Sequence, residues 1–298
     1  MKHVILTPNP YRDKGFRTVR TAMQILKDAG MEPKVCLPFD VDRSFELPKD
    51  IRFHRLDREI NNTELVICFG GDGTILHMAK TATRRNVPIL GVNIGTLGFM
   101  AELEATELEL LSKLADDDYT LDNRMMLDVV VQRDRDIIFH DIGLNDVVIT
   151  KGSVARIAHL AVKIDGAEAM QCGGDGVIIA TPTGSTAYSL SAGGPIVEPE
   201  ASNMLITPIC AHDVMSRSMV ASDKRTVTVE LVQNARRNAY LSVDGGKSLR
   251  LNMGDVTTIT VSSPARVPTT TLIFMESIAD AAALARPGNV WITTRFCA

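Results

Sequence analysis

The spacing of apolar residues changes near residue 122, and this change limits the folds open to the chain. Before residue 122, continuous apolar runs alternate with longer segments whose apolar residues recur at helical spacing. This alternation is typical of βαβ units and predicts a mostly parallel sheet. After residue 122, short strand-like runs follow one another between turn residues. The second region is therefore expected to be all-β.

The apolar runs also place the expected elements. In the first region we expect strands at 4–6, 33–37, 65–69 and 89–92, helices at 13–29 and 106–116, and a helix after Thr74. In the second we expect strands at 127–131, 146–149, 159–164, 176–179, 226–231 and 256–261. The fold class is thus an α/β N-terminal domain with a mostly parallel sheet at 1–122, followed by an all-β C-terminal domain at 123–270. Residues 271–298 form a C-terminal segment that either stands apart or packs back on the first domain.

Composition narrows the partners that such a chain can bind. The 298 residues carry a net charge of −4 and 5% aromatic side chains, so neither a positive field nor a base-stacking surface favours nucleic acid. The longest uncharged stretch, Gly176–Val197, contains two prolines and four glycines, which excludes a lipid-facing helix. The five cysteines form no CxxC pair and suit a reducing compartment, so we expect a cytoplasmic protein without a membrane partner.

A glycine-rich loop follows the apolar run at 65–69. Its sequence, Gly70-Gly71-Asp72-Gly73-Thr74, lies between an expected strand and an expected helix, where backbone N–H groups hold phosphates. Thr74 is a natural N-cap for that helix. Neither the lysine of a Walker A loop nor the third glycine of a Rossmann loop follows.

Asp72 is the unusual residue of this loop, because a carboxylate repels phosphate. Either a divalent cation lies between the two groups, or the carboxylate accepts a proton from a hydroxyl group. Both alternatives indicate phosphoryl transfer or nucleotide binding. The structural alternative is an Asx-turn between glycines.

Two further segments carry polar groups suited to a nucleoside. Asn145-Asp146 offers an amide and a carboxylate to ribose hydroxyls, although such a pair is also common in plain turns. In the second segment, Asp175 is a further ribose acceptor and Tyr188 offers a flat face to a ring. We expect a hydroxyl-lined loop there and a short helix from Ser185, whose free N–H groups would form a second anion site. The segment reads Gly174-Asp175-Gly176, Thr181-Pro182-Thr183-Gly184-Ser185-Thr186-Ala187-Tyr188 and Gly193-Gly194-Pro195.

The sequence lacks the motifs typical of transition-metal sites and of hydrolase triads. The six histidines form neither HxH nor HExxH, so a transition-metal site is not expected, and no ligand set for a metal can be named. Ser185 lies outside a GxSxG elbow, which argues against a hydrolase triad.

Taken together, these motifs resemble the NAD kinases, which are ATP or polyphosphate:NAD 2′-phosphotransferases. The resemblance covers about residues 60–262. The glycine-aspartate loop is shared with lipid kinases and phosphofructokinases, whereas the hydroxyl-rich motif is specific. The motifs that carry it are Gly70–Thr74, Asn93-Ile94-Gly95-Thr96-Leu97-Gly98-Phe99, Leu144-Asn145-Asp146, Thr181–Tyr188 and Gly193–Pro195.

The resemblance implies a kinase that phosphorylates the adenosine ribose 2′-hydroxyl of NAD, with ATP or polyphosphate as donor and Mg²⁺ or another divalent cation. It further implies a homodimer or homotetramer. Asp72 then matches the residue that accepts the hydroxyl proton, and Gly73 supports the same site. The other matching residues are Phe99 beside the adenine, Asn145 and Asp146 at a ribose, Arg156 as a basic ligand contact, and Asp175, Thr186, Ala187, Tyr188 and Ser191 at the nicotinamide and adenine.

The chain also departs from the family pattern. Asp146 replaces the usual glutamate, Gly173 stands where many members carry arginine, and Gly246 follows Asp244-Gly245 where glutamine is common. The basic, aromatic C-terminal segment of the family is not apparent. Two alternatives therefore stay open, a catalytically silent NAD(P)-binding sensor and a lipid or sugar kinase that shares only the first loop. The second alternative does not explain Thr181–Tyr188.

Overall fold

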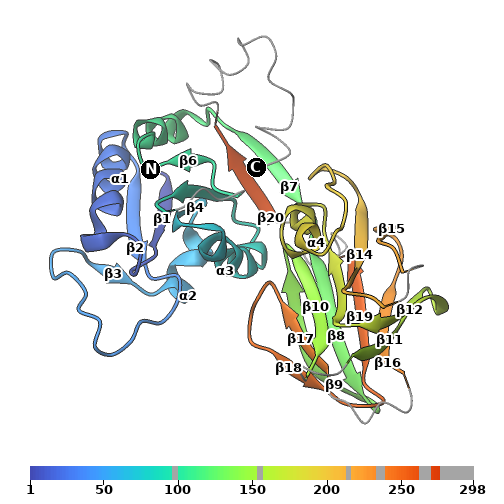
Figure 1. Ribbon diagram of the computed structural model, residues 1–298. Coiled ribbons are helices and arrows are strands. Elements are labelled where there is room, and N and C mark those ends of the chain that lie inside the picture. Colours follow the sequence, from blue (N-terminus) through green and yellow to red (C-terminus); the bar gives the residue numbers. More distant parts are fainter. Residues whose placement is uncertain (96–99, 153–156, 213–215, 233–238, 262–269, 276–298) are drawn as a thin grey trace. The chain divides into compact units, whose positions relative to one another are not determined.

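A computed structural model describes residues 1–95, 100–152, 157–212, 216–232, 239–261 and 270–275 (Figure 1). The chain forms two compact units, of which the first comprises residues 1–123 with the residues from 270 on, and the second residues 124–269. The predicted fold class is confirmed, since the first unit is α/β and the second consists of antiparallel sheets. Among the described residues, no helix is long and apolar enough to cross a membrane.

The first unit contains one sheet in the order β3-β2-β1-β4-β5-β20-β7, with β6 also paired to β5. The pairs from β3 to β20, and the pair of β5 with β6, are parallel. Strand β20 joins this sheet beside β5, so the segment after residue 270 contributes a strand to the first unit. The strands are β1 His3–Pro8, β2 Glu32–Cys36, β3 Phe53–His54, β4 Leu65–Gly70, β5 Ile89–Asn93, β6 Leu103–Glu104, β7 Thr120–Arg124 and β20 Thr270–Phe274.

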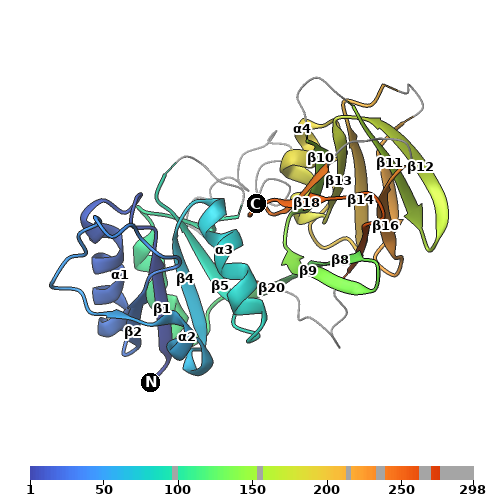
Figure 2. The ribbon, with the colours of Figure 1, turned by 90° about the horizontal axis from the view of Figure 1, so that it is seen from below.

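Helices cover both faces of this sheet because its central strands are apolar on both sides (Figure 2). Helix α1, Arg17–Asp28, and the 3₁₀ helix η3, Leu108–Asp116, pack with Leu6, Ile67 and Leu90. Helix α3, Asp72–Thr83, packs against β4 and β5 with Ile75 and Met78 buried. The short helices are η1 Lys14–Phe16, α2 Leu56–Glu59 and η2 Ile60–Asn62.

Two helix boundaries differ from the sequence-based expectation. Helix α1 begins at Arg17 rather than at residue 13, because the Asp13 carboxylate accepts the N–H groups of Thr18 and Val19, each at 3.0 Å, from outside the helix. Its end agrees with the expected stop, since Gly30 adopts a φ of +79°. The segment expected as a helix at 106–116 is the 3₁₀ helix η3, which begins at Leu108.

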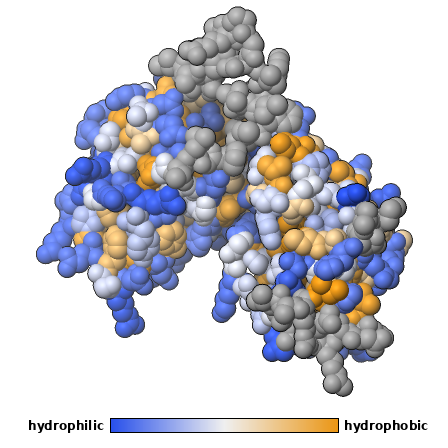
Figure 3. Space-filling model, viewed as in Figure 1, coloured by the Kyte–Doolittle hydropathy of each residue, from blue (hydrophilic) through white to orange (hydrophobic). Residues whose placement is uncertain are grey.

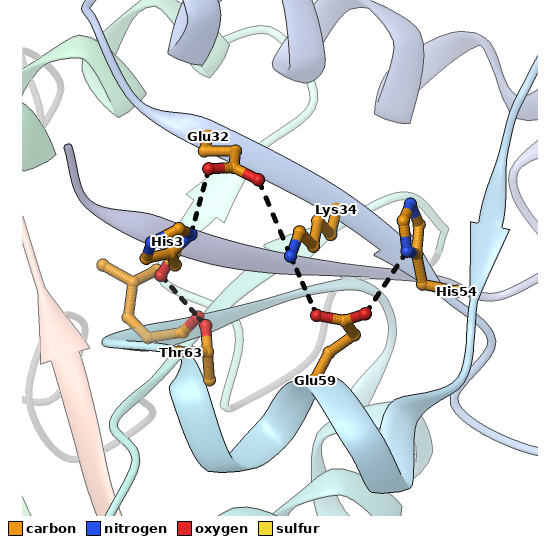
Figure 4. Close-up of polar contacts among 7 residues, drawn as sticks. His3, Glu32, Lys34, His54, Glu59 and Thr63 are labelled. Carbon is orange, nitrogen blue, oxygen red and sulfur yellow. Dashed lines mark hydrogen bonds and ion pairs between the residues drawn. The ribbon is translucent and has the colours of Figure 1, made fainter.

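A network of charged side chains ties β2 and β3, at one end of the sheet, to β1 and α2 (Figure 4). Lys34 lies between two carboxylates, with its Nζ 3.0 Å from Glu59 Oε2 and 3.6 Å from Glu32 Oε1. His3 contacts Glu32 at 3.2 Å and His54 contacts Glu59 at 3.3 Å. The hydrogen bond from Lys34 is the main cause that lowers the pKa of Glu59. Because these groups are partly exposed to solvent, we expect them to fix strand positions more than to add stability.

The second unit is a sandwich of two antiparallel sheets. One has the order β15-β14-β13-β10-β17-β18 and the other β12-β11-β16-β19-β8-β9. Alternate side chains of both, including Val129, Leu160, Ile149 and Ile179, form the shared core. The strands are β8 Leu127–Arg133, β9 Asp136–Gly143, β10 Asp146–Lys151, β11 Ala158–Ile164, β12 Ala167–Gly174, β13 Gly176–Ala180, β14 Asn203–Ile209, β15 Met219–Ser222, β16 Val227–Leu231, β17 Ala239–Val243, β18 Leu249–Leu251 and β19 Val256–Val261.

The outer face of the first of these sheets carries the hydroxyl-rich segment. Ile178, Ala180 and Leu205 point away from the shared core and pack with Ala192 and Val197. The segment forms a 3₁₀ helix η4, Thr183–Thr186, followed by one turn of helix α4, Tyr188–Ser191. This packing fixes the motif on the sandwich.

Candidate functional site

The candidate residues of the first unit lie at one edge of its sheet. Strands β1, β4 and β5 are parallel neighbours that end at Pro8, Gly70 and Asn93. The segments that follow them therefore meet at the carboxyl edge, where open α/β sheets bind ligands. Backbone hydrogen bonds join them, from Asn9 N to Phe69 O at 2.8 Å and from Ile94 N to Gly70 O at 3.1 Å.

The glycine-rich loop holds its carboxylate at the start of α3. Asp72 is the first residue of the helix, and its Oδ1 accepts the Met100 N–H at 3.1 Å. The structural alternative of an Asx-turn does not describe this contact, because its donor is 28 residues away in the sequence. A Cβ built on Gly71 or Gly73 would meet no atom of the described residues within 4 Å, so none of these residues covers the loop backbone at the two glycines.

The prediction that Thr74 caps α3 is wrong. The helix begins three residues earlier than predicted, at Asp72, with Gly71 at the N-cap. Thr74 is buried inside the first turn, and its hydroxyl accepts a hydrogen bond from Asn9 Nδ2 at 3.1 Å. A side chain at Gly70 would overlap this hydroxyl group, which explains the glycine at the end of β4. Thr74 thus holds the loop against the segment after β1.

In the second unit, Asn145 and Asp146 lie at the start of β10. Asp244 Oδ1 accepts the N–H groups of Asn145 and Asp146 at 2.8 and 3.0 Å, and its Oδ2 accepts that of Leu144 at 2.8 Å. Asp146 is 6% exposed. Burial, and to a smaller extent the negative charge of Asp244, raises the pKa of Asp146 to about 7. The expected ribose acceptor can therefore carry a proton near neutral pH.

The hydroxyl-rich segment packs directly on this pair. Thr181 donates its N–H to Asn145 O at 2.9 Å and its hydroxyl to Leu144 O at 2.6 Å. A side chain at Gly184 would overlap the Asn145 carbonyl group, so close approach requires a glycine there. Asn145 Oδ1 is buried and has no hydrogen-bond partner among the described residues. Since an unpaired buried oxygen is costly, this atom is suited to accept a hydrogen bond from a ligand.

Several hydroxyl groups of the segment point inward, contrary to the expectation of a hydroxyl-lined loop. Ser185 exchanges hydrogen bonds with Val197, and Ser189 contacts Thr207 Oγ1 at 2.9 Å. The expected anion site at a helix starting from Ser185 is also wrong, because the Ser185 N–H already donates to Pro182 O at 3.1 Å. Of the residues predicted to contact NAD in this segment, Tyr188 is 43% exposed, Ser191 is exposed, and Thr186 and Ala187 are partly buried.

Asp175 lies between β12 and β13 and forms an ion pair with Lys151, with Oδ1 and Nζ 2.6 Å apart. A Cβ on the neighbouring Gly174 would lie 2.7 Å from Ile209 O, so the chain passes close to β14 here. At Gly173 a Cβ would lie 3.5 Å from His159 Nδ1, an ordinary contact that leaves room for a side chain. Phe99 and Arg156, which the sequence also predicts at the site, lie outside the described residues.

Sequence reasoning missed two residues of the second unit. Asp244 was noted from the sequence only because Gly246 departs from the family pattern. A signal was present, since an Asp-Gly pair between two strand-like runs indicates a tight turn beside the end of a sheet. Lys151 carried no signal, because its partner Asp175 is 24 residues away. Among the described residues, no three histidine, cysteine, aspartate or glutamate side chains are placed to hold a metal ion.

Two family models match the chain in succession. Residues 9–119 match the ATP-NAD kinase N-terminal domain, and residues 144–269 match the ATP-NAD kinase C-terminal domain. A curated relative from Acetivibrio thermocellus named NAD kinase is 39% identical over 269 residues, which are 90% of this chain and 91% of the relative. Another, the NAD kinase of Trichlorobacter lovleyi, is 39% identical over 88% of this chain and 90% of its own.

Solved structures show the same fold. The yeast NADH kinase complexed with NADH superposes with a TM-score of 0.78 at 24% identity, covering 99% of this chain and 90% of that one. The NAD kinase from Archaeoglobus fulgidus in complex with ATP gives a TM-score of 0.69 at 25% identity, covering 95% of this chain and 97% of that one.

Proposed function

The chain belongs to the NAD kinase family, and from this membership we propose that it transfers a phosphoryl group to NAD and makes NADP. The observation that carries the proposal is the match to both family domains in order, together with close relatives over nine-tenths of the chain. The chain is accordingly a phosphotransferase. The acceptor is the 2′-hydroxyl of the adenosine ribose, and the donor is ATP or polyphosphate.

Asp72 is proposed as the general base. Its carboxylate accepts the proton of the 2′-hydroxyl while that oxygen forms a bond to the terminal phosphorus of the donor, and the bond from phosphorus to the leaving oxygen breaks. The Met100 N–H holds Oδ1, and the open space above Gly71 and Gly73 admits the transferred group. Both features support this role.

The metal requirement follows from the donor. Mg²⁺ is commonly held by one or two carboxylates together with substrate phosphates, and it neutralises the charge that develops on phosphoryl oxygens. The described residues offer no ready-made cluster of metal ligands, and Asp72 is assigned to the proton transfer, so the donor phosphates would supply ligands of the cation. We therefore expect Mg²⁺, or another divalent cation, to enter with the donor.

The second unit is proposed to bind NAD. Asn145 Oδ1, buried and unpaired, accepts a hydrogen bond from a ribose hydroxyl, and Asp146 contacts the same sugar. Tyr188 presents its exposed ring to a base. Asp175, Arg156, Phe99, Thr186, Ala187 and Ser191 complete the proposed set.

A coupled assay tests the proposal. The purified protein is incubated with NAD, Mg²⁺ and either ATP or polyphosphate, and NADP is detected with an NADP-specific dehydrogenase. NADP formation is expected with at least one donor. Binding of NAD without any turnover would instead identify a silent NAD(P)-binding sensor, and phosphorylation of a lipid or sugar in place of NAD would identify the other alternative.

The variant Asp72→Asn tests the base. It keeps the shape of the side chain but removes its basicity, so we expect NAD binding to persist while turnover falls by about 10²- to 10⁴-fold. Asp50→Asn is a matched control, because Asp50 is an exposed carboxylate paired with Arg20. Near-normal turnover of Asp72→Asn with intact NAD binding would remove Asp72 from the chemistry.

A homodimer or homotetramer in the cytoplasm is proposed as well. Leu190, Ile196 and Val220 are at least 40% exposed, and Figure 3 shows apolar residues at the upper end of the second unit. Such surface is commonly covered by a partner. Sedimentation velocity measures the mass of the assembly, and a monomer at micromolar concentration would contradict it.

The cytoplasmic location is supported by the cysteines. Cys36, Cys68 and Cys172 are buried free thiols, which suits a reducing compartment.

A further inference from the structure

The three segments at the carboxyl edge of the first sheet carry few charged side chains. Residues 9–16, 71–74 and 94–95 include the charged groups of Arg12, Asp13, Lys14 and Asp72. Asp13 is buried and accepts two N–H groups of α1, so it does not face a ligand. Arg12 is exposed, and no ion pair or side-chain hydrogen bond joins it to another described residue.

The segment that carries Arg12 is held firmly in place. Asn9 receives the N–H groups of Arg12 and Asp13 on its carbonyl oxygen, at 3.1 and 2.9 Å, and that of Tyr11 on its side chain, at 3.1 Å. The same side chain donates to Thr74 in the first turn of α3. The backbone turn that presents Arg12 is therefore fixed to the glycine-rich loop.

Gly95 makes room for the guanidinium group. A Cβ built on Gly95 would lie 2.6 Å from Arg12 Nη1 and 3.7 Å from its Cζ. Gly95 is itself held by Asn93, whose Oδ1 accepts its N–H at 3.2 Å, and Asn93 donates to Glu104 at 3.0 Å. The missing side chain lets the guanidinium lie against the loop that is bonded to Gly70.

From this geometry we propose that Arg12 binds the phosphate chain of the phosphoryl donor. A guanidinium matches phosphate oxygens with two parallel N–H donors, and its charge offsets the repulsion between Asp72 and the donor. The inference rests on the proposed function, because it names the donor contact of that same site. ATP and polyphosphate both offer such phosphate oxygens, and kinetics with each donor distinguish which of the two the protein uses.

Steady-state kinetics of Arg12→Ala test the proposal with each donor in turn. The KM of the donor that the protein uses should rise by about 10- to 100-fold, the scale of one charge-assisted contact, while the KM for NAD stays within about twofold. Arg12→Lys keeps the charge but loses the two parallel N–H donors of the guanidinium, so its KM for the donor should lie between those of the wild type and Arg12→Ala. The matched control is Arg84→Ala, since Arg84 is exposed at the opposite end of α3.

Gly95→Ala provides an independent test with the arginine still present. The added methyl group displaces the guanidinium, so the KM for the donor should rise in the same direction as in Arg12→Ala. An unchanged donor KM in both variants would overturn the proposal, as would an equal rise in the KM for NAD.

Calorimetry keeps this test separate from the proposed function. If the wild type fails to make NADP with either donor, the proposed function fails by itself. Binding of ATP and of inorganic tripolyphosphate to the wild type and to Arg12→Ala is then compared without NAD. A weaker affinity of the variant for the ligand that binds supports the phosphate contact, whereas equal affinities, or no binding to the wild type, overturn it.

Discussion

Replacing Asp146 by asparagine should remove the contribution of this carboxyl group to the pH dependence of the free energy of unfolding. Asp146 is 6% exposed, and burial together with the charge of Asp244 raises its pKa from 3.8 to about 7. Below pH 3.8 the carboxyl group carries a proton in both the folded and the unfolded chain. Between pH 3.8 and 7 the unfolded chain loses this proton while the folded chain keeps it, so unfolding becomes easier as the pH rises.

The size of the effect follows from the shift. A difference of roughly three pKa units, at 1.36 kcal/mol each, amounts to about 4 kcal/mol at most. Asparagine has nearly the same shape and never ionises. We therefore compare the free energy of unfolding of Asp146→Asn with that of the wild type at each pH. The value for the variant minus the value for the wild type should increase by up to about 4 kcal/mol between pH 4 and pH 8.

Denaturant unfolding at several pH values measures this difference, and Asp165→Asn is the matched control. Hydrogen bonds from the Thr226 N–H and from Arg225 lower the pKa of Asp165, so its contribution is complete above about pH 4 and the difference between Asp165→Asn and wild type should stay constant from pH 5 to 8. Asp244→Asn removes one cause of the raised pKa and should move the Asp146 transition to lower pH. Parallel curves for wild type and Asp146→Asn would refute the reasoning.

Two substitutions in the hydroxyl-rich segment, Gly184→Ala and Tyr188→Ala, separate packing from binding, and Gly173→Ala in β12 is the control. Gly184→Ala forces a methyl group onto the Asn145 carbonyl, so we expect a loss of about 1–3 kcal/mol of folding free energy in denaturant unfolding, together with a higher KM for NAD. Gly173→Ala, whose Cβ meets only His159 at 3.5 Å, should stay within about 0.5 kcal/mol of wild type. Tyr188→Ala should weaken NAD binding by about 1–3 kcal/mol in calorimetry without changing stability, and an unchanged affinity would remove Tyr188 from the site.

The strands were predictable because their signal is local. The five consecutive apolar residues Leu65–Phe69, followed at once by glycines, are typical of a strand in the middle of a covered sheet, and the structure forms β4 there. The alternating run at 127–131 likewise became β8, with one face in the sandwich core. In both cases the side chains that specify the strand lie within it.

The polar contacts of the site were less predictable because their partners are distant in the sequence. Asp244 holds backbone groups 98 to 100 residues away, and Asn9 holds Thr74 across 65 residues. A hydroxyl group in a Ser/Thr-rich segment can face solvent or the sheet beneath it, and composition does not distinguish the two. The wrong expectations for Thr74 and for the hydroxyl-lined loop have this common cause.

The four Asp-Gly pairs of the chain show where local pattern does separate structure from function. In two of the pairs both residues adopt a positive φ, which is the backbone conformation of a tight turn between strands. The φ angles are 50° at Asp165 and 83° at Gly166, and 49° at Asp244 and 66° at Gly245. Asp72 and Asp175 are not among the residues with positive φ in the described part of the chain.

The difference has a physical origin that is visible in the sequence. Asp72 and Asp175 each follow a glycine, whereas Asp165 follows Ile164 and Asp244 follows Val243, so the turn aspartates directly continue an apolar strand. At Gly174 the extra glycine lets the backbone pass close to Ile209, and at Gly71 it leaves the space beside the helix start open. The aspartate after such a glycine is thus placed by the surrounding backbone rather than by its own turn. The Asp165 and Asp244 carboxylates accept backbone N–H groups beside their turns, whereas Asp72 accepts the N–H of Met100 from another segment and Asp175 pairs with the side chain of Lys151.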